Sequence, residues 1–212
     1  MKPVEEKLLI AGPAGQIEVI AEDPGKPRGI ALIAHPHPLG GGANTNKVAY
    51  TLARTFLSLG YAAYRPNFRG VGASEGTHDE GEGETEDLLA VLAEAKRRHG
   101  DLPVVLAGFS FGAYCQTRVA ERLASTGQAA QRLVLVGTAA GFVEGTRHYE
   151  TGAVPADTIV IHGSVDETVP LTNVLAWAQE HDLPVVVVPG ADHFFHRRLH
   201  LIRDIITRAW RD

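Results

Sequence analysis

Short apolar runs alternate with amphipathic segments along most of the chain. Apolar runs that predict strands fall at residues 29–34, 61–65, 103–107, 132–136, 158–161 and 184–188. Segments with apolar side chains at helical spacing fall at residues 46–59, 85–99, 113–124, 171–181 and 196–210. Strands that alternate with helices predict an α/β fold, with a mostly parallel twisted sheet covered by helices on both faces.

The beginning of the chain departs from this alternation. Residues 7–11 and 16–21 are short strand-like segments on either side of a glycine-rich turn, so they predict an antiparallel hairpin. Two connections are long: the acidic, glycine-rich residues 70–84 and the aperiodic residues 137–157, which are too few for a substantial lid domain. Neither a repeat nor a linker is evident, so residues 1–212 are expected to form a single domain.

Composition excludes several classes of protein. The chain is 44% apolar and 21% charged, which is typical of a globular domain. Its formal net charge of −5 gives no indication of a basic surface that would bind nucleic acid or an anionic membrane. Because no signal-like or membrane-spanning stretch is evident and Cys115 is the only cysteine, a cytoplasmic location is expected. Cys115 is interpreted as a packed core thiol.

The most informative motif is Gly108-Phe109-Ser110-Phe111-Gly112, which follows the apolar run at 103–107. A Gly-x-Ser-x-Gly between a strand and a helix is a nucleophile elbow. The tight turn forces the serine into strained backbone angles, and its glycines avoid collisions with neighbouring backbone. The alternative is a tight turn with an inert serine, so the motif depends on partners elsewhere in the chain.

A serine hydroxyl needs a base, and the base needs an orienting acid. Asp166 lies in the loop after the strand at 158–161, and His193 lies in the loop after the last strand. Both loops are expected at the carboxyl ends of parallel strands, where open α/β sheets place their sites. Glu167 and Asp157 are alternative acids.

Other histidines and carboxylates near these loops are weaker candidates. Asp192 adjoins His193, and neighbouring side chains on an extended loop point apart. His196 and His200 have helical spacing, which favours surface or packing roles. His35-x-His37 has a spacing found among metal ligands, with Asp79, Glu80 and Glu82 as candidates for further ligands. The simpler interpretation of 79–87 is a solvated loop and helix start, so neither a metal nor another cofactor is expected.

Four motifs in combination resemble the α/β-hydrolase fold enzymes. They are Gly-Phe-Ser-Phe-Gly at 108–112, His-Gly-x-x-Asp-x-x-Val-Pro at 162–170, Gly-Ala-x-His-x-Phe at 190–195 and His-Pro-His-Pro-Leu-Gly-Gly at 35–41. The last motif is similar to that of a small, lidless hydrolase and carboxylesterase branch, and the resemblance spans about residues 28–200. It implies Ser110 as nucleophile, His193 as general base and acid, and Asp166 as the residue that orients His193.

An oxyanion hole needs two N–H donors, and the backbone N–H of Phe111 is expected to be one. For the other, the resemblance of residues 35–38 to a His-Gly-x-Pro loop implies the N–H of His37, although Pro36 replaces the usual glycine. Leu39 is the second candidate, because prolines have no N–H. The bond preceding Pro38 is a candidate for the cis form.

These features predict acyl transfer to water on a small or accessible ester, through an acyl-enzyme on Ser110. An open site is expected, lined by five phenylalanines: Phe109, Phe111, Phe142, Phe194 and Phe195. Thioester or amide cleavage by the same residues is an alternative. An alternative from another class is a non-catalytic binding protein on a hydrolase fold.

Overall fold

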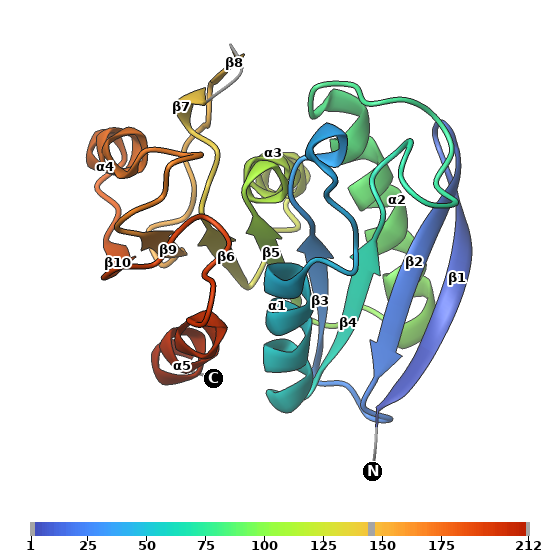
Figure 1. Ribbon diagram of the computed structural model, residues 1–212. Coiled ribbons are helices and arrows are strands. Elements are labelled where there is room, and N and C mark those ends of the chain that lie inside the picture. Colours follow the sequence, from blue (N-terminus) through green and yellow to red (C-terminus); the bar gives the residue numbers. More distant parts are fainter. Residues whose placement is uncertain (1–2, 144–146, 211–212) are drawn as a thin grey trace.

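The computed structural model describes residues 3–143 and 147–210 of the 212-residue chain. An eight-stranded sheet with the order β1-β2-β4-β3-β5-β6-β9-β10 forms its centre (Figure 1). The strands of this sheet are β1 (Val4–Gly12), β2 (Gly15–Asp23), β3 (Gly29–Ala34), β4 (Tyr61–Pro66), β5 (Val104–Phe109), β6 (Arg132–Val136), β9 (Ile159–Gly163) and β10 (Val185–Val188).

The sheet is antiparallel at one edge and parallel elsewhere. β1 pairs antiparallel with β2 through the turn at Gly12–Gly15, and β2 pairs antiparallel with β4. From β4 to β10 every neighbouring pair is parallel. The predicted hairpin and mostly parallel sheet are therefore confirmed. β3 and β5 are buried along their whole length, because helices cover both faces of the parallel part.

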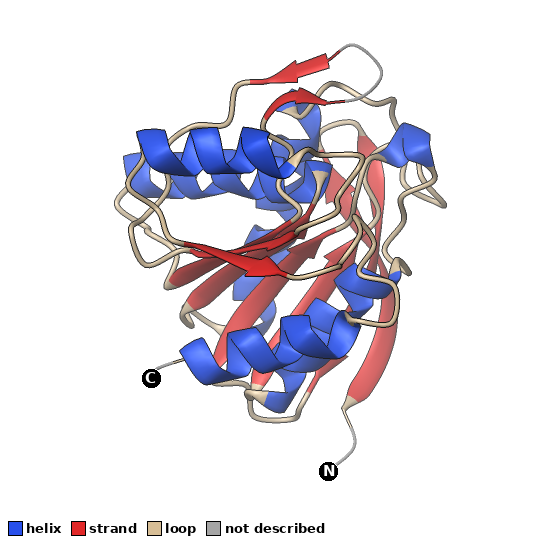
Figure 2. Cartoon of the chain, turned by 60° about the vertical axis from the view of Figure 1, so that its left-hand side comes forward, coloured by secondary structure: helices blue, strands red, loops and turns tan. Residues whose placement is uncertain are grey.

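The outer layers are formed by helices, of which the described residues contain five α-helices (Figures 1 and 2). They are α1 (Lys47–Ser58), α2 (Glu82–His99), α3 (Phe111–Ser125), α4 (Leu171–Glu180) and α5 (Leu199–Ala209). α1 and α5 contribute to the apolar cluster on one face of the sheet, and α2, α3 and α4 to the cluster on the other face. In the described part of the chain, no helix combines the length and the apolar character needed to cross a membrane.

The connection at 137–157 is more ordered than its sequence pattern predicts. It contains a second, two-stranded antiparallel sheet of β7 (Gly141–Val143) and β8 (Arg147–Tyr149), which projects beside α4 (Figure 1). The guanidinium of Arg147 lies 4.5 Å from the ring centre of Tyr149. Each strand has three residues, so this hairpin is far smaller than a lid domain.

The acidic run at 79–87 is a loop and helix start, as expected, and Asp79, Glu80 and Glu82 are exposed, but Glu84 and Asp87 are buried, so the expectation of a solvated run was wrong for these two residues. α2 begins at Glu82 rather than at residue 85, because the fully buried Glu84 accepts the N–H of Gly81 at 2.8 Å. Asp87 is also buried and accepts two hydrogen bonds from Arg69, at 2.8 and 2.9 Å. Both carboxylates hold the loop before α2 against the body of the protein.

Cys115 on α3 is fully buried, as expected of a core thiol. Burial raises the pKa of this thiol well above its usual value, so the sulfur is protonated and poorly nucleophilic at neutral pH.

The two elbow glycines allow α3 to approach β3 and β5 closely. A Cβ atom on Gly108 would lie 2.4 Å from the carbonyl oxygen of Gly112. A Cβ atom on Gly112 would lie 2.4 Å from the carbonyl oxygens of both Ala34 and His35. All of these collisions involve backbone atoms, which cannot rotate away.

We expect Gly112→Ala to lower the free energy of unfolding by roughly 1–3 kcal/mol, because the new methyl group must displace backbone. Gly152→Ala is the matched control, since no atom lies within 4 Å of its added Cβ. Urea denaturation of both variants measures the difference. Equal free energies of unfolding for the two variants would contradict the proposed close approach.

Candidate active site

Ser110 occupies the sharp turn between β5 and α3. Its backbone angles are φ 56° and ψ −121°, a conformation that is strained for a residue with a side chain. Its N–H donates to the carbonyl of Val136 at 2.9 Å, and its carbonyl accepts the N–H of Ala113 at 3.0 Å. Hydrogen bonds to β6 and α3 therefore hold the turn in its strained form.

Ser110, His193 and Asp166 come together in the segments that follow the carboxyl ends of β5, β10 and β9. His193 Nε2 lies 3.0 Å from Ser110 Oγ, and His193 Nδ1 lies 2.7 Å from Asp166 Oδ2. With Asp166 ionised, Nδ1–H donates to the carboxylate and the lone pair of Nε2 faces the serine hydroxyl. This tautomer is the one that a general base requires.

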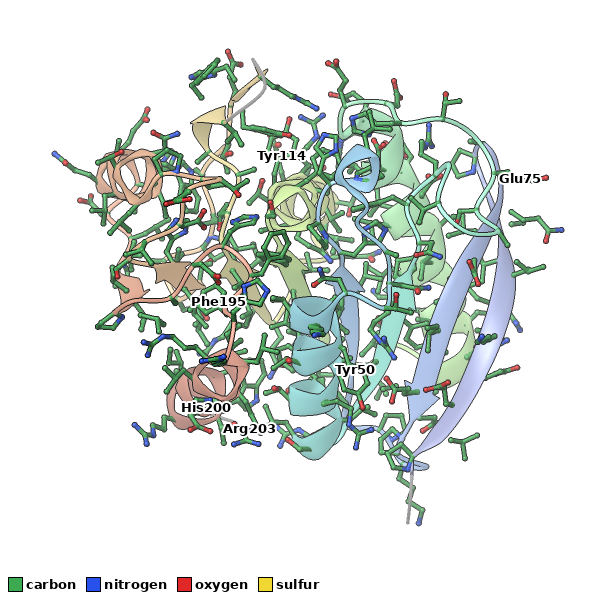
Figure 3. All side chains as sticks on the ribbon, viewed as in Figure 1. Tyr50, Glu75, Tyr114, Phe195, His200 and Arg203 are labelled. Atoms are coloured by element: carbon green, nitrogen blue, oxygen red, sulfur yellow. The ribbon has the colours of Figure 1, made fainter. Side chains whose placement is uncertain are left out.

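The alternative acids and histidines lie elsewhere. Asp157 forms an ion pair with Arg132 at 3.3 Å, and Glu167 is an exposed neighbour of Asp166. Asp192 accepts a hydrogen bond from His196 Nδ1 at 2.6 Å. His200 is an exposed residue of α5, as labelled in Figure 3.

The other carboxylate oxygen of Asp166 fixes its own loop. Asp166 Oδ1 accepts the N–H groups of Thr168 and Val169, at 3.0 and 2.8 Å. Contact with His193 and capping of the loop at 166–169 are thus made by different oxygens of one side chain. This arrangement leaves Asp166 little rotational freedom, so His193 is also held in place.

His162 is a member of this site that the sequence interpretation missed. Its ring is fully buried on β9; Nε2–H donates to the carbonyl of Val169 at 2.9 Å, and the same atom lies 3.4 Å from Asp166 Oδ2. Burial lowers the pKa of His162, so the ring is neutral beside the carboxylate. The signal was the His-Gly that precedes Asp166 in the 162–170 motif.

A pocket of about 210 Å³ opens at Ser110 and His193. Its walls come from the loop after β3, from Asn46 before α1, and from the loops that carry Asp166 and His193. The lining residues are Pro36, His37, Gly40, Gly41, Gly42, Asn46, Ser110, Thr168, His193 and Phe194.

Of the five phenylalanines expected to line the site, only Phe194 does so, with 46% of its surface exposed. Phe109 is fully buried, and its ring centre lies 4.8 Å from that of His193, so it supports the imidazole from the protein interior. Phe111 and Phe195 are also buried. Phe142 is 59% exposed on β7 and is not part of this pocket lining.

The loop after β3 leaves one of its predicted donors free. Within the 3-10 turn Pro38–Gly40, the N–H of Leu39 donates to His37 Nδ1 at 3.3 Å. The following glycines donate to the carbonyls of His37 and Pro38. Leu39 is therefore a poor second candidate. The N–H groups of His37 and Phe111 have no acceptor among the described residues, so the protein's own hydrogen bonds leave both of them unused.

The peptide bond before Pro38 is trans, as is every peptide bond between described residues, so the expectation of a cis bond was wrong. Burial lowers the pKa of the His37 ring, with His78 and Arg147 adding to the effect. The neutral ring can then accept the N–H of Leu39, which fixes the turn.

His35 ties the loop after β3 to the loop after β4. Its fully buried ring donates from Nδ1 to the carbonyl of Pro36 at 2.7 Å and accepts the N–H of Phe68 on Nε2 at 2.9 Å. Both nitrogens are therefore engaged by backbone, which disfavours metal ligation by His35-x-His37. His37 instead packs against His78 and Phe111, with ring centres 4.7 and 4.9 Å away.

Burial lowers the pKa of His35 to about 4 from its usual 6.5. The unfolded chain therefore binds one more proton than the folded chain between these values, and this contribution to stability is lost as the pH falls from 6.5 towards 4. We expect the stability advantage of the wild type over His35→Asn to shrink by roughly 2–3 kcal/mol between pH 7.5 and 4.5.

Urea denaturation of both proteins over this pH range measures that difference. Subtracting the variant removes the contributions of all other titrating groups that the two proteins share. A constant difference across the range would mean that His35 does not titrate as its burial predicts.

Similarity to known proteins agrees with this geometry. Residues 25–156 match the family described as "Serine aminopeptidase, S33". The uncharacterized protein RP471 of Rickettsia prowazekii (strain Madrid E) is 32% identical over 200 residues, which cover 89% of this chain and 82% of that protein.

Two solved structures extend the similarity to three dimensions. An alpha-beta serine hydrolase homologue from Coxiella burnetii is 40% identical with a TM-score of 0.83, and 97% of each chain is covered. XC6422 from Xanthomonas campestris, a serine hydrolase without lid, is 33% identical with a TM-score of 0.85, covering 97% of this chain and 93% of that one. The chain belongs to this family of α/β serine hydrolases, and its fold is of the lidless kind.

Proposed function

We propose that the protein is a carboxylesterase-like serine hydrolase that cleaves small or accessible esters through an acyl-enzyme on Ser110. The observation that carries the proposal is the hydrogen-bonded chain from Ser110 Oγ through His193 to Asp166, at 3.0 and 2.7 Å. Ser110 and His193 line an open pocket, so a substrate carbonyl can reach the serine hydroxyl.

In the first half of the reaction, Ser110 Oγ attacks the ester carbonyl while His193 Nε2 takes the hydroxyl proton. Asp166 stabilises the resulting imidazolium. The N–H groups of His37 and Phe111 stabilise the oxyanion of the tetrahedral intermediate. When this intermediate collapses, His193 returns the proton to the leaving alkoxide, which departs as an alcohol and leaves the acyl-enzyme.

In the second half, water attacks the acyl-enzyme carbonyl and gives its proton to His193. Collapse of the second tetrahedral intermediate releases the carboxylic acid and restores the Ser110 hydroxyl. The strained turn at Ser110 holds the nucleophile and the N–H of Phe111 next to each other throughout, so no large rearrangement is needed between the two halves.

Amide cleavage is the second candidate, because the family description names an aminopeptidase. An aminopeptidase must recognise a free ammonium group, for which carboxylates are the natural partners. Neither the pocket at Ser110 nor the larger pocket beside it includes a carboxylate in its lining. This favours esters over amino-terminal peptides. Thioesters remain compatible with the same residues, because the triad serves both kinds of carbonyl.

We expect Ser110→Ala to reduce kcat for 4-nitrophenyl acetate by roughly 1,000-fold or more, since no nucleophile remains. Labelling by a fluorophosphonate probe should disappear at the same time. Ser125→Ala is the matched control, because that serine lies at the exposed end of α3. If the wild type neither labels nor turns over esters, thioesters or aminoacyl nitroanilides, the non-catalytic binding protein is the better description.

The small open pocket also predicts a preference for short acyl groups. A chain of twelve or more carbons would leave most of its apolar surface in water, because the fold has no lid to cover it. We expect kcat/KM for 4-nitrophenyl esters to be highest for acyl groups of about two to six carbons. A series of acyl lengths measures this preference, and a maximum at long chains would contradict it.

A further inference from the structure

A second pocket of about 370 Å³ lies directly beside the one at Ser110. We call it the entrance pocket. The two pockets share Gly41, Asn46 and Phe194 as a common wall. The full lining of the entrance pocket is Gly41, Ala43, Thr45, Asn46, Lys47, Val48, Phe194, His196, Arg197 and Leu199.

The entrance pocket forms where two distant segments meet. One is the start of α1, and the other is the segment between β10 and α5, which lie on the same face of the sheet (Figure 1). Phe195 anchors the second segment, since its ring is buried in the core shared with α1 and α5. Phe194 and His196 on either side of it are exposed and reach the pocket.

The charge of the entrance pocket is positive. Lys47 and Arg197 are its two cations, and its lining contains no carboxylate. Within the described chain neither cation has an ion-pair partner, whereas Arg65 and Arg69 each contact a carboxylate within 3.0 Å. A protein with a formal net charge of −5 thus keeps two uncompensated cations beside its nucleophile.

The third basic side chain of the lining, His196, is hydrogen-bonded within its own segment. His196 donates from Nδ1 to Asp192 Oδ2 at 2.6 Å, and its backbone N–H donates to Asp192 Oδ1 at 3.0 Å. The Asp192 carboxylate is therefore satisfied by His196 and lies outside the pocket lining. Lys47 and Arg197 remain to bind an anion from solution.

We propose that the entrance pocket binds a carboxylate group of the substrate through Lys47 and Arg197, so that the preferred substrates are anionic esters. This inference rests on the proposed esterase function and narrows its substrate class. An arginine fork and a lysine ammonium suit a carboxylate, because both donate charge-assisted hydrogen bonds. The shared wall at Phe194 would leave the carboxylate in the entrance pocket while the ester carbonyl reaches Ser110.

Two matched pairs of esters test the proposal from both sides of the ester bond. On the acyl side, the mono-4-nitrophenyl ester of adipic acid is compared with 4-nitrophenyl hexanoate. On the alcohol side, 4-acetoxybenzoate is compared with its methyl ester. We expect the wild type to prefer the anionic member of at least one pair by roughly fivefold to tenfold in kcat/KM, through a lower KM. The preference should weaken as ionic strength rises.

The variant Lys47→Gln/Arg197→Gln should lose this preference and keep its turnover of the neutral ester. Arg203→Gln/Arg208→Gln is the matched control, since it removes the same charge from exposed positions on α5, where Figure 3 labels Arg203. The control should keep the preference. Thermal melting of both double variants checks that each remains folded.

The outcomes separate the two proposals. If the wild type hydrolyses the neutral esters but shows no anionic preference, or if Lys47→Gln/Arg197→Gln retains the preference, the carboxylate site is overturned and the esterase function stands. If no ester is turned over faster than by Ser110→Ala, the esterase function fails and the carboxylate site fails with it.

Discussion

The positive φ of Ser110 is the constraint on which the rest of the site depends. A side chain at φ 56° is held there only because Gly108 and Gly112 let α3 approach β3 and β5 to backbone contact. That approach places the start of α3 against the loop after β3. Ser110 and the two N–H groups without an acceptor, at His37 and Phe111, are thus positioned by one feature of the backbone.

The positions of His193 and Asp166 depend on a second close approach, between the loops after β9 and β10. A Cβ atom on Gly163 would lie 2.4 Å from the carbonyl oxygen of Ala191, and the N–H of Val165 donates to that same carbonyl at 3.1 Å. Gly190 N–H donates to Ser164 Oγ at 2.7 Å. Because these bonds join the two loops, they hold Asp166 and His193 together beside Ser110.

Sequence reasoning located the features that have a local signal. The elbow and the alternating strands and helices follow from short-range patterns, so the sheet and the positions of Ser110, Asp166 and His193 were predictable. Features that depend on distant partners were not. The sequence pattern around Glu84 and Asp87 predicted a solvated run. Their burial could not be predicted, because it relies on the distant Arg69 and on neighbouring backbone N–H groups. β7 and β8 are too short to show any periodicity.

Phe109 shows how a strand's burial decides what its side chains can contact. Every residue of β5 is buried, so the side chain preceding Ser110 supports His193 from within and cannot meet a substrate. With no lid above the site, little apolar surface is left to enclose the acyl group of the proposed ester substrates. In the proposed function, discrimination between substrates then falls to the exposed edge of the pocket, where Phe194 and the cations Lys47 and Arg197 lie. Recognition at such an edge is electrostatic and sensitive to salt, which suits a polar substrate better than a lipid.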